Sequence, residues 1–478
     1  MNYPKIIQGG MGVAISSWQL AQAVSKQGQL GVISGTGVGI VLIARLMDGD
    51  KGGHIRRALA HFPQADVVQR ILDNYYIEGG KASDKGYKRP TMWTIKPPPV
   101  LEELTVVANF VEVWLAKEGH NNPVGINLLE KVQMPTMASL YGAMLADVDI
   151  VIMGAGIPTQ VPAILDVLAN HHAVKYRLDV LGEGADDETY IHFNPQRSFS
   201  EIPQAIDKLK RPNFFPIVSS VVLAKALQKR SIGEINGLII EMPSAGGHNA
   251  PPRTKNNFNE VGEPIYTEKD AVDLEKITEL GLPFWLAGGY GHAHKLQEAL
   301  ANGAQGIQVG TAFAFCAESG MVDTIKTSII EQIHQEIATV FTDPSASPTG
   351  FPFKVVQLDD TASNSGIYQQ RSRICDIGYL RQLYRDDSDK LHYRCSAEPI
   401  EAYLKKGGEL ENTVGRKCLC NHLGAAAGYP QKRSNGYIEP SLVTSGDDLY
   451  ALAEFMSDDM RHYSAEDVIT TLLSLDKA

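Results

Sequence analysis

Short apolar runs alternate with helical patterns along most of the chain before residue 310. Many of these runs end in glycine or another small residue. Runs that are apolar on both faces and joined by helices predict a parallel sheet covered by helices. We therefore predict eight strands, at residues 5–8, 30–34, 123–129, 149–153, 214–218, 237–241, 283–287 and 306–309.

The intervals between several runs carry apolar residues at helical spacing. Residues 18–28 place Leu20 and Val24 on one face and close with Gly28. Residues 296–303 repeat this pattern and close with Gly303, a residue typical of helix C-termini. Eight strands separated by such helices predict an α/β fold of the (β/α)8 TIM barrel type, and a doubly wound open sheet is the alternative.

Three segments do not fit eight simple strand–helix units. Residues 48–119 form a helical insertion that we interpret as a lid, and 346–478 form a long C-terminal extension that contains cysteines. Residues 173–200 have the pattern of an added hairpin with GEGADDE as its turn. The barrel itself is therefore predicted at 1–47 and 120–345.

Charge and apolar content exclude several classes of partner. The formal net charge is −11, without a block of like charges, which argues against binding to nucleic acid or to an anionic membrane surface. The apolar windows fall short of the ~20 residues that a membrane span needs, and residues 1–10 lack the pattern of a signal peptide. We expect a cytoplasmic protein and leave a homo-oligomer open.

The chain has five cysteines, four of them in the extension, at 375, 395, 418 and 420. Their successive gaps of 20, 23 and 2 residues do not match common zinc motifs, and five cysteines in so long a chain are no disulfide scaffold. We expect reduced structural thiols and no metal. Cys316, just after the last predicted strand, is expected to pack in the core.

Barrel enzymes carry their sites at the carboxyl ends of the strands, often with a phosphate group after strands seven and eight. Those two ends read LAGGYG (286–291) and QVGTAF (308–313). Gly288, Gly289 and Gly291 would let backbone N–H groups approach an anion closely. Gly310 and Thr311 would add a second cradle with a hydroxyl. Two glycine turns at consecutive strand ends predict a bound phosphate.

Other strand ends complete the predicted site. The first strand ends in QGGMG (8–12), and the third places Asn127 at its end. After the sixth strand, Gly246 and Gly247 would admit a ligand edge, and His248 would lie at the mouth as a proton acceptor or hydrogen-bond donor. Pro251 and Pro252 would stiffen the next loop. We interpret Arg253 as a solvated charge rather than an anchor for an anionic substrate.

The ordered set IIQGGMG, GINLL, IMGAG, AGGH, LAGGYG and QVGTAF resembles the nitronate monooxygenase family, formerly called 2-nitropropane dioxygenases, over roughly residues 3–345. The flavin-dependent enoyl-acyl-carrier-protein reductases are relatives of that family. Two features depart from its pattern: Ser244 stands where an acidic residue is usual, and Asn-Ala-Pro-Pro follows the histidine.

The resemblance implies an FMN-dependent enzyme with His248 as the catalytic residue beside the flavin. It also implies that FMN is bound by Gln8, Gly9, Gly10, Met11, Asn127, Gly154, Ser219, Glu241, Gly246, Gly247, Ala287, Gly288, Gly289, Gly291, Val309, Gly310 and Thr311. The implied reaction oxidises an alkyl nitronate or nitroalkane with O2 to a carbonyl compound and nitrite.

Two other functions remain open at this point. One is an NAD(P)H-dependent reductase of an enoyl thioester or quinone on the same flavin site. The other is a phosphate-binding barrel without redox chemistry. In every case the expected partners are small molecules: a nitronate or other electron donor, O2, and NAD(P)H for a reductase.

Overall fold

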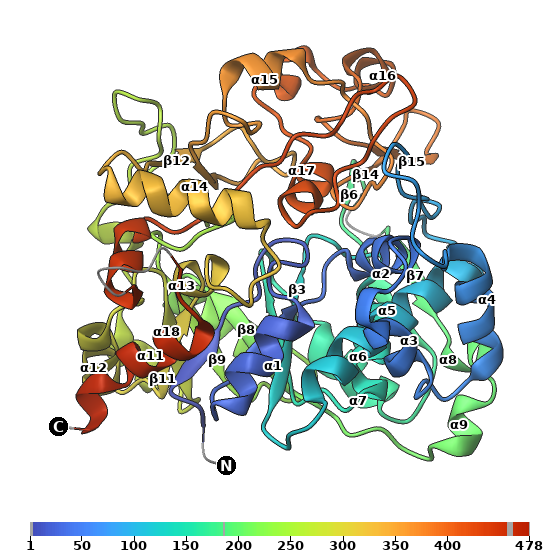
Figure 1. Cartoon of the computed structure of the whole chain (residues 1–478), viewed down its shortest axis with the longest axis horizontal. Helices are drawn as coiled ribbons and strands as arrows, with labels where there is room; N and C mark the ends of the chain where they lie inside the picture. Colours follow the sequence, from blue (N-terminus) through green and yellow to red (C-terminus); the bar gives the residue numbers. More distant parts are fainter. Residues whose placement is uncertain (1–2, 185–186, 457–461, 478) are drawn as a thin grey trace.

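A closed ring of eight parallel strands forms the centre of the computed structural model, which describes residues 3–184, 187–456 and 462–477 (Figure 1). Each strand pairs with the next barrel strand along the chain. A parallel bridge between Ile7 and Leu30 joins the first strand to the second, and the last strand pairs with the first. The strands are β1 (Ile6–Gln8), β2 (Gly31–Ser34), β3 (Val124–Leu129), β4 (Ile150–Gly154), β8 (Asn213–Val218), β9 (Leu238–Glu241), β10 (Phe284–Ala287) and β11 (Gly306–Val309). The predicted barrel is confirmed and the open sheet is wrong.

Helices cover the outside of this ring. The predicted helices at 18–28 and 296–303 are confirmed: Gly28 and Gly303 both have positive φ directly after α1 and α12. The helices that follow barrel strands are α1 (Trp18–Lys26), α2 (Val38–Met47), α6 (Thr136–Leu145), α7 (Val161–Leu168), α10 (Val221–Arg230), α11 (Leu274–Thr278), α12 (Ala293–Ala301), α13 (Thr311–Ala314) and α14 (Asp323–His334).

Large apolar side chains fill the barrel below its mouth. Trp285 is fully buried, stacks on Phe215 with ring centroids 4.9 Å apart, and donates from Nε1 to the Pro4 carbonyl at 2.9 Å. Tyr3 meets the Trp285 ring edge-on at 5.4 Å. These aromatic groups close the end of the ring where the strands begin. A ligand can therefore bind only at the other end, where the strands finish.

The segment 48–119 contains a short 3-10 helix (Lys51–Gly53), α3 (His54–Leu59), α4 (Ala65–Tyr75) and α5 (Pro99–Lys117). Helix α5 packs against α1, α2 and α6, and nearly all of its side chains are buried. Glu112 on α5 accepts a hydrogen bond from the Trp18 backbone N–H at 3.1 Å and pairs with Arg45. Residues 99–117 are therefore part of the helical layer of the barrel. A lid function for the segment stays a prediction.

The predicted hairpin is present. Strand β5 (Val174–Arg177) pairs antiparallel with β7 (Tyr190–Phe193), followed by α8 (Pro195–Ser198) and α9 (Ile202–Ala205). Residues 185 and 186 of the predicted turn lie outside the described residues. The short β6 (Val180–Leu181) pairs instead with a strand of the extension, so the hairpin contacts that part of the chain.

The extension folds over the barrel mouth and along one side of the barrel, above the strands in Figure 1. Its strand β13 (Phe353–Val356) pairs with β12 (Val340–Asp343), and its last α-helix, α18 (Ala465–Leu472), packs against α1 and α12. Its elements, with β12, are β12 (Val340–Asp343), β13 (Phe353–Val356), α15 (Ser365–Gln370), β14 (Gln382–Arg385), β15 (Leu391–Arg394), α16 (Ile400–Lys405), α17 (Leu419–Ala426) and α18 (Ala465–Leu472). Short 3-10 helices cover Glu268–Asp270, Leu410–Thr413, Leu449–Phe455 and Ser474–Lys477. The extension and the barrel share one hydrophobic core.

Within the described residues, no helix combines the length and the apolar character that a crossing of the bilayer would require.

Candidate functional site

A cavity of about 550 Å³ opens at the carboxyl ends of the barrel strands. It gathers nearly all of the residues that the sequence points to. The predicted site residues that line it are Gly9, Gly10, Met11, Asn127, Gly154, Ser219, Glu241, Gly246, Gly247, His248, Ala287, Gly288, Gly289, Gly291, Val309, Gly310 and Thr311. Its size falls within the range of ~300–1,000 Å³ that is usual for small-molecule and cofactor sites.

Gln8 does not line the cavity. Its side chain is fully buried, where Nε2 donates to Ser16 Oγ at 2.8 Å and Oε1 accepts from the Val32 N–H at 3.0 Å. Ser16 Oγ in turn donates to the Gly9 carbonyl and accepts from the Met11 N–H. Gln8 therefore shapes the turn from behind, and a direct contact to a ligand stays a prediction.

The turn after β1 depends on a missing side chain. A Cβ on Gly10 would lie 2.3 Å from the Asn127 Cβ, and Asn127 Nδ2 donates to the Gly10 carbonyl at 3.1 Å. Within the described residues, Asn127 Oδ1 and Gln308 Oε1 are buried without a hydrogen-bond partner, although both residues line the cavity. Buried amide oxygens are normally satisfied, so these two indicate a ligand that donates hydrogen bonds here.

The turn after β10 has the form that the sequence predicts for an anion cradle. Gly288 and Gly289 have φ of 88° and 71°, and a Cβ on Gly288 would lie 2.9 Å from the Met242 carbonyl oxygen. In the described structure, the backbone N–H groups of Gly289, Gly291 and Thr311 donate no hydrogen bond. All three residues line the cavity, and free N–H groups at this place suit a phosphate oxygen.

The extension supplies the far wall of this cradle, which the sequence analysis missed. Thr444 Oγ1 accepts from the Gly247 N–H at 2.8 Å, and the Gly446 N–H donates to Thr311 Oγ1 at 3.0 Å. Both residues line the cavity together with Ser445 and Asp448. The small residues of TSG (444–446), which follow the apolar pair Leu442–Val443, were the one local signal that could have indicated this contact.

Asp448 lies at the edge of the cradle. Burial raises the pKa of its carboxyl above the usual range, and a hydrogen bond with the Thr311 hydroxyl opposes this shift. An anion bound beside Asp448 would raise that pKa further, because like charges disfavour ionisation. A protonated carboxyl at this position would donate a hydrogen bond to the anion instead of repelling it.

His248 is held by the extension. It forms an antiparallel bridge with Phe353, whose ring meets the imidazole edge-on at 4.9 Å, and its Nε2 lies 2.7 Å from Ser347 Oγ. Burial, reinforced by the charge of Lys131, holds the pKa of His248 well below its usual value of 6.5. The imidazole is therefore neutral at pH 7 and can accept a proton.

Two further ionisable groups matter here, because the charge of Lys131 acts on both His248 and Glu241. Burial raises the pKa of Glu241, a lining residue, to about 7. Burial lowers the pKa of Lys131 to about 7, and within the described residues its Nζ has no hydrogen-bond partner, although it lies 3.7 Å from the centre of the Phe351 ring. Sequence reasoning predicted Glu241 and missed Lys131, which follows β3 without a recognisable motif.

The lining is otherwise mainly apolar. Leucines from the extension, at 380, 419, 423 and 442, also line the cavity. Among the described lining residues none is lysine or arginine. Arg253 is exposed and outside the cavity, where its backbone N–H donates to Asp270 at 2.8 Å. Cys316 is fully buried in the core. No group of three His, Cys, Asp or Glu among the described residues is arranged to hold a metal ion.

Comparison with known proteins identifies relatives of part of the chain. Residues 198–348 match the family model described as nitronate monooxygenase. The chain is 29% identical over 166 residues to (3aS,4S,5R,7aS)-5-hydroxy-7a-methyl-1-oxo-octahydro-1H-indene-4-carboxyl-CoA dehydrogenase of Rhodococcus jostii, covering 34% of this chain and 40% of that protein. It is 27% identical over 223 residues to a probable nitronate monooxygenase of Staphylococcus saprophyticus, covering 43% of this chain and 60% of that protein. The chain thus spans about two fifths to three fifths of the length of these relatives.

Solved structures are similar along the whole chain at low identity. FabK from Thermotoga maritima superposes with a TM-score of 0.47 and 15% identity, covering 100% of this chain and 93% of that one. Nitroalkane oxidase from Streptomyces ansochromogenes superposes with a TM-score of 0.48 and 13% identity, covering 98% and 95%.

Proposed function

From the premise that this chain is related to the nitronate monooxygenase family, whose model matches residues 198–348, we propose that it is an FMN-dependent oxidoreductase. The observation that carries the proposal is the cavity at the barrel mouth. It combines free backbone donors at the Gly288–Gly289 turn, unpartnered oxygens on Asn127 and Gln308, and His248 on one wall.

The residues present fit FMN. Gly289, Gly291 and Thr311 would hold the phosphate through N–H groups, and Thr444–Gly446 would cover it. The side-chain-free turn at Gly9–Gly10 would leave room for the flat ring. Asn127 Oδ1 and Gln308 Oε1 would accept hydrogen bonds from ligand N–H groups. When bound, the flavin would supply electron transfer, which no side chain of this chain provides.

The finer proposal is oxidation of an alkyl nitronate or nitroalkane, which the family match supports. His248 would accept the α-proton of a neutral nitroalkane. Ser347 Oγ accepts from the Thr349 N–H at 3.2 Å and lies 2.8 Å from Thr349 Oγ1, so it can also accept a proton-bearing Nε2 of His248. That arrangement would leave Nδ1 as the ring atom that takes the proton.

A second candidate is an NAD(P)H-dependent reductase of an enoyl thioester or quinone, and the cavity lining favours it. A neutral substrate needs no cation, and the lining carries leucines in place of lysine or arginine. Reduction of a carbon–carbon double bond also needs a proton donor. Glu241, whose pKa is raised to about 7, is a lining group that still carries a proton in a large fraction of molecules at neutral pH.

The decisive experiment begins with the visible spectrum of the purified protein, before and after addition of FMN. Under anaerobic conditions, fast bleaching of bound flavin by NADPH or NADH would support the reductase. Bleaching only by a nitronate would support the monooxygenase. A colourless protein that does not take up FMN would contradict both and would favour a phosphate-binding barrel without redox chemistry.

A further inference from the structure

The four cysteines of the extension converge on one small cavity behind the wall of the large one. Cys375, Cys395, Cys418 and Cys420 all line it, although up to 45 residues separate them in sequence. The space measures about 10 Å³, which is no more than one water molecule needs. Such a volume leaves no room for an iron–sulfur cluster between the four cysteines.

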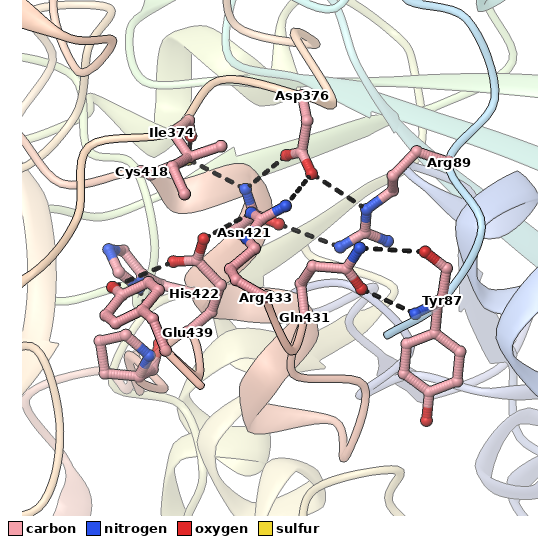
Figure 2. A network of polar contacts seen from close by, with 12 residues as sticks. Tyr87, Arg89, Ile374, Asp376, Cys418, Asn421, His422, Gln431, Arg433 and Glu439 are labelled. Carbon is pink, nitrogen blue, oxygen red and sulfur yellow. Dashed lines mark hydrogen bonds and ion pairs between the residues drawn. The ribbon is translucent and has the colours of Figure 1, made fainter. Parts of the chain in front are cut away.

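A partly buried polar network fixes the two segments that carry three of these thiols (Figure 2). Asp376 accepts hydrogen bonds from Asn421 Nδ2 at 2.9 Å and from Arg433 at 2.7 Å, and it pairs with Arg89 at 3.4 Å. Arg433 also pairs with Glu439 at 2.6 Å. Asp376 and Asn421 directly follow Cys375 and Cys420 in the chain, so the network holds the backbone at both thiols.

Two of the four thiols form an unequal pair. The Cys395 thiol shares a hydrogen bond with Cys375, which lowers the pKa of Cys375, and Arg381 favours the same shift. This hydrogen bond and burial raise the pKa of Cys395 well above its usual value. Cys375 is partly exposed, whereas Cys395 is buried. Burial raises the pKa of Cys418 and of Cys420, the latter to about 12, so neither is a ready nucleophile.

We propose that Cys375 and Cys395 form a peroxide-sensitive dithiol that closes reversibly into a disulfide. The Cys375 sulfur attacks hydrogen peroxide, breaks the O–O bond, and becomes a sulfenic acid with release of one water molecule. The Cys395 sulfur then attacks the Cys375 sulfur, and the hydroxyl group leaves with a proton as a second water molecule. Two thiols lose two electrons in total and one peroxide molecule gains them.

The location couples this pair to the large cavity. Leu380, Leu419 and Cys420 line both the thiol cavity and the large cavity. Cys375 lies only a few residues before Tyr379 and Leu380, which line the large cavity. A bond between Cys375 and Cys395 would therefore constrain the segment that carries these two lining residues. The inference does not rest on the proposed function, because the thiols can be oxidised whatever the large cavity binds.

Peptide mapping of the full chain tests the proposal. The purified protein is treated with hydrogen peroxide, its remaining thiols are blocked with N-ethylmaleimide, and it is digested with trypsin without reduction. Trypsin places the relevant cysteines on separate peptides, at 374–381, 395–405 and 418–432. We expect most of the first two peptides to appear as one linked species that dithiothreitol separates. A link to peptide 418–432, or no link at all, would overturn the proposal.

Variants sharpen this result. Cys395→Ser is expected to leave Cys375 as a sulfenic acid that dimedone labels, whereas Cys375→Ser should abolish both the link and the label. Cys316→Ser serves as the matched control, because that thiol is buried elsewhere in the core, and it should leave the link unchanged. Elemental analysis of the untreated protein adds an independent check: one zinc or iron per chain, lost in Cys375→Ser, would show a metal site and overturn the dithiol.

Discussion

Single side chains at the cavity determine how activity should depend on pH, and His248 is the first of them. Because burial keeps its pKa well below 6.5, the imidazole is already the free base throughout the neutral range. We expect His248 itself to cause no fall in turnover of a neutral nitroalkane between pH 8 and pH 6, so a step in that range would report Glu241 or Lys131, whose pKa values lie at about 7. His248→Ala should keep bound flavin and lose this activity by ~100-fold or more, with a smaller loss on preformed nitronates. Steady-state rates on both substrates measure this, and an equal loss on both would contradict the base role.

Lys131 is expected to lower the stability of the fold, since its amino group is buried without a hydrogen bond. Its pKa falls from 10.5 in the unfolded chain to about 7 in the fold, so its cost to stability grows as the pH falls from 10.5 to 7. Lys131→Met should therefore stabilise the protein at pH 7.5 by on the order of 1–3 kcal/mol. The gain should shrink at pH 9.5. Urea denaturation at fixed FMN concentration measures both values, and a less stable variant would reveal a partner for the ammonium.

Sequence reasoning worked well for those site residues whose chemistry lies in the backbone. Glycine runs directly after apolar strands show where a ligand can approach, and His248 stands out because it follows such a run. Lys131 and Asp448 could not be found in this way. Their significance comes from burial against residues of other segments, such as Phe351 and Thr311, and nothing in their local sequence indicates that environment.

At the scale of elements, the turn after β10 is the most informative. Gly289→Val places a β-branched residue at φ 71° and brings a side chain to the free N–H groups. We expect FMN affinity to fall at least ~tenfold, or roughly 1.4 kcal/mol. Gly281→Val is the matched control: Gly281 has φ 73°, a Cβ there would meet open space, and it precedes β10 at the other end of the barrel. Titration with FMN, monitored by flavin fluorescence, measures the affinity of both variants. Equal affinities would mean that the turn after β10 does not bind the phosphate.

Helix α17 carries a second element-scale prediction through His422. This buried imidazole is neutral, with Nδ1 donating to the Pro440 carbonyl at 2.7 Å, and burial lowers its pKa from 6.5 to about 4. The unfolded chain takes up the proton first as the pH falls, so stability is lost between pH 6.5 and pH 4, on the order of 3 kcal/mol from this residue.

His422→Asn tests this loss, because the amide keeps an N–H near the position of Nδ1 and removes the titration. Urea denaturation at pH 7 and pH 4.5 should give a smaller loss of stability for the variant than for the unaltered protein. The comparison is between the two pH-dependent differences, so a general destabilisation by the substitution does not affect it. Equal differences would mean that folding does not lower the pKa of His422.

Elements of the barrel were predictable because local and tertiary signals agree there. All eight predicted strands lie within one residue of the observed bounds, since each is an apolar run that glycine, proline or another turn residue interrupts. Helix α5 was harder to assign. It is buried on nearly all sides, so its apolar residues do not form a one-sided stripe, and the sequence grouped it with the inserted segment.

On the scale of the whole molecule, the extension is a structural part of the barrel. Ala312 accepts a hydrogen bond from the Tyr463 hydroxyl at 2.7 Å, and the hydrophobic core on this side of the barrel includes Leu452, Val468 and Leu472 of the extension. A chain that ends at residue 345 would expose this core and lose the wall over the cradle. We expect it to aggregate and to bind no FMN, as gel filtration and flavin absorbance would report. A monodisperse fragment 1–345 that binds FMN would contradict this prediction.

The role of the extension is what sequence alone could not give. Its contacts with the barrel join residues more than one hundred positions apart, such as Thr311 and Gly446, and no periodic pattern connects them. Composition identified a long segment with cysteines. Only the fold shows that the segment closes the ligand space and holds His248 through Phe353.

The aromatic closure of the barrel by Trp285 and Tyr3 has a kinetic consequence. With the ring filled below its mouth, nothing passes along the barrel axis, so every molecule reaches the ligand space from the side that the extension covers. If the cavity binds a flavin as proposed, an electron donor and an electron acceptor would share this one entrance. A shared entrance of this kind would favour departure of the first product before the second reactant arrives, which is the order of events in a ping-pong reaction.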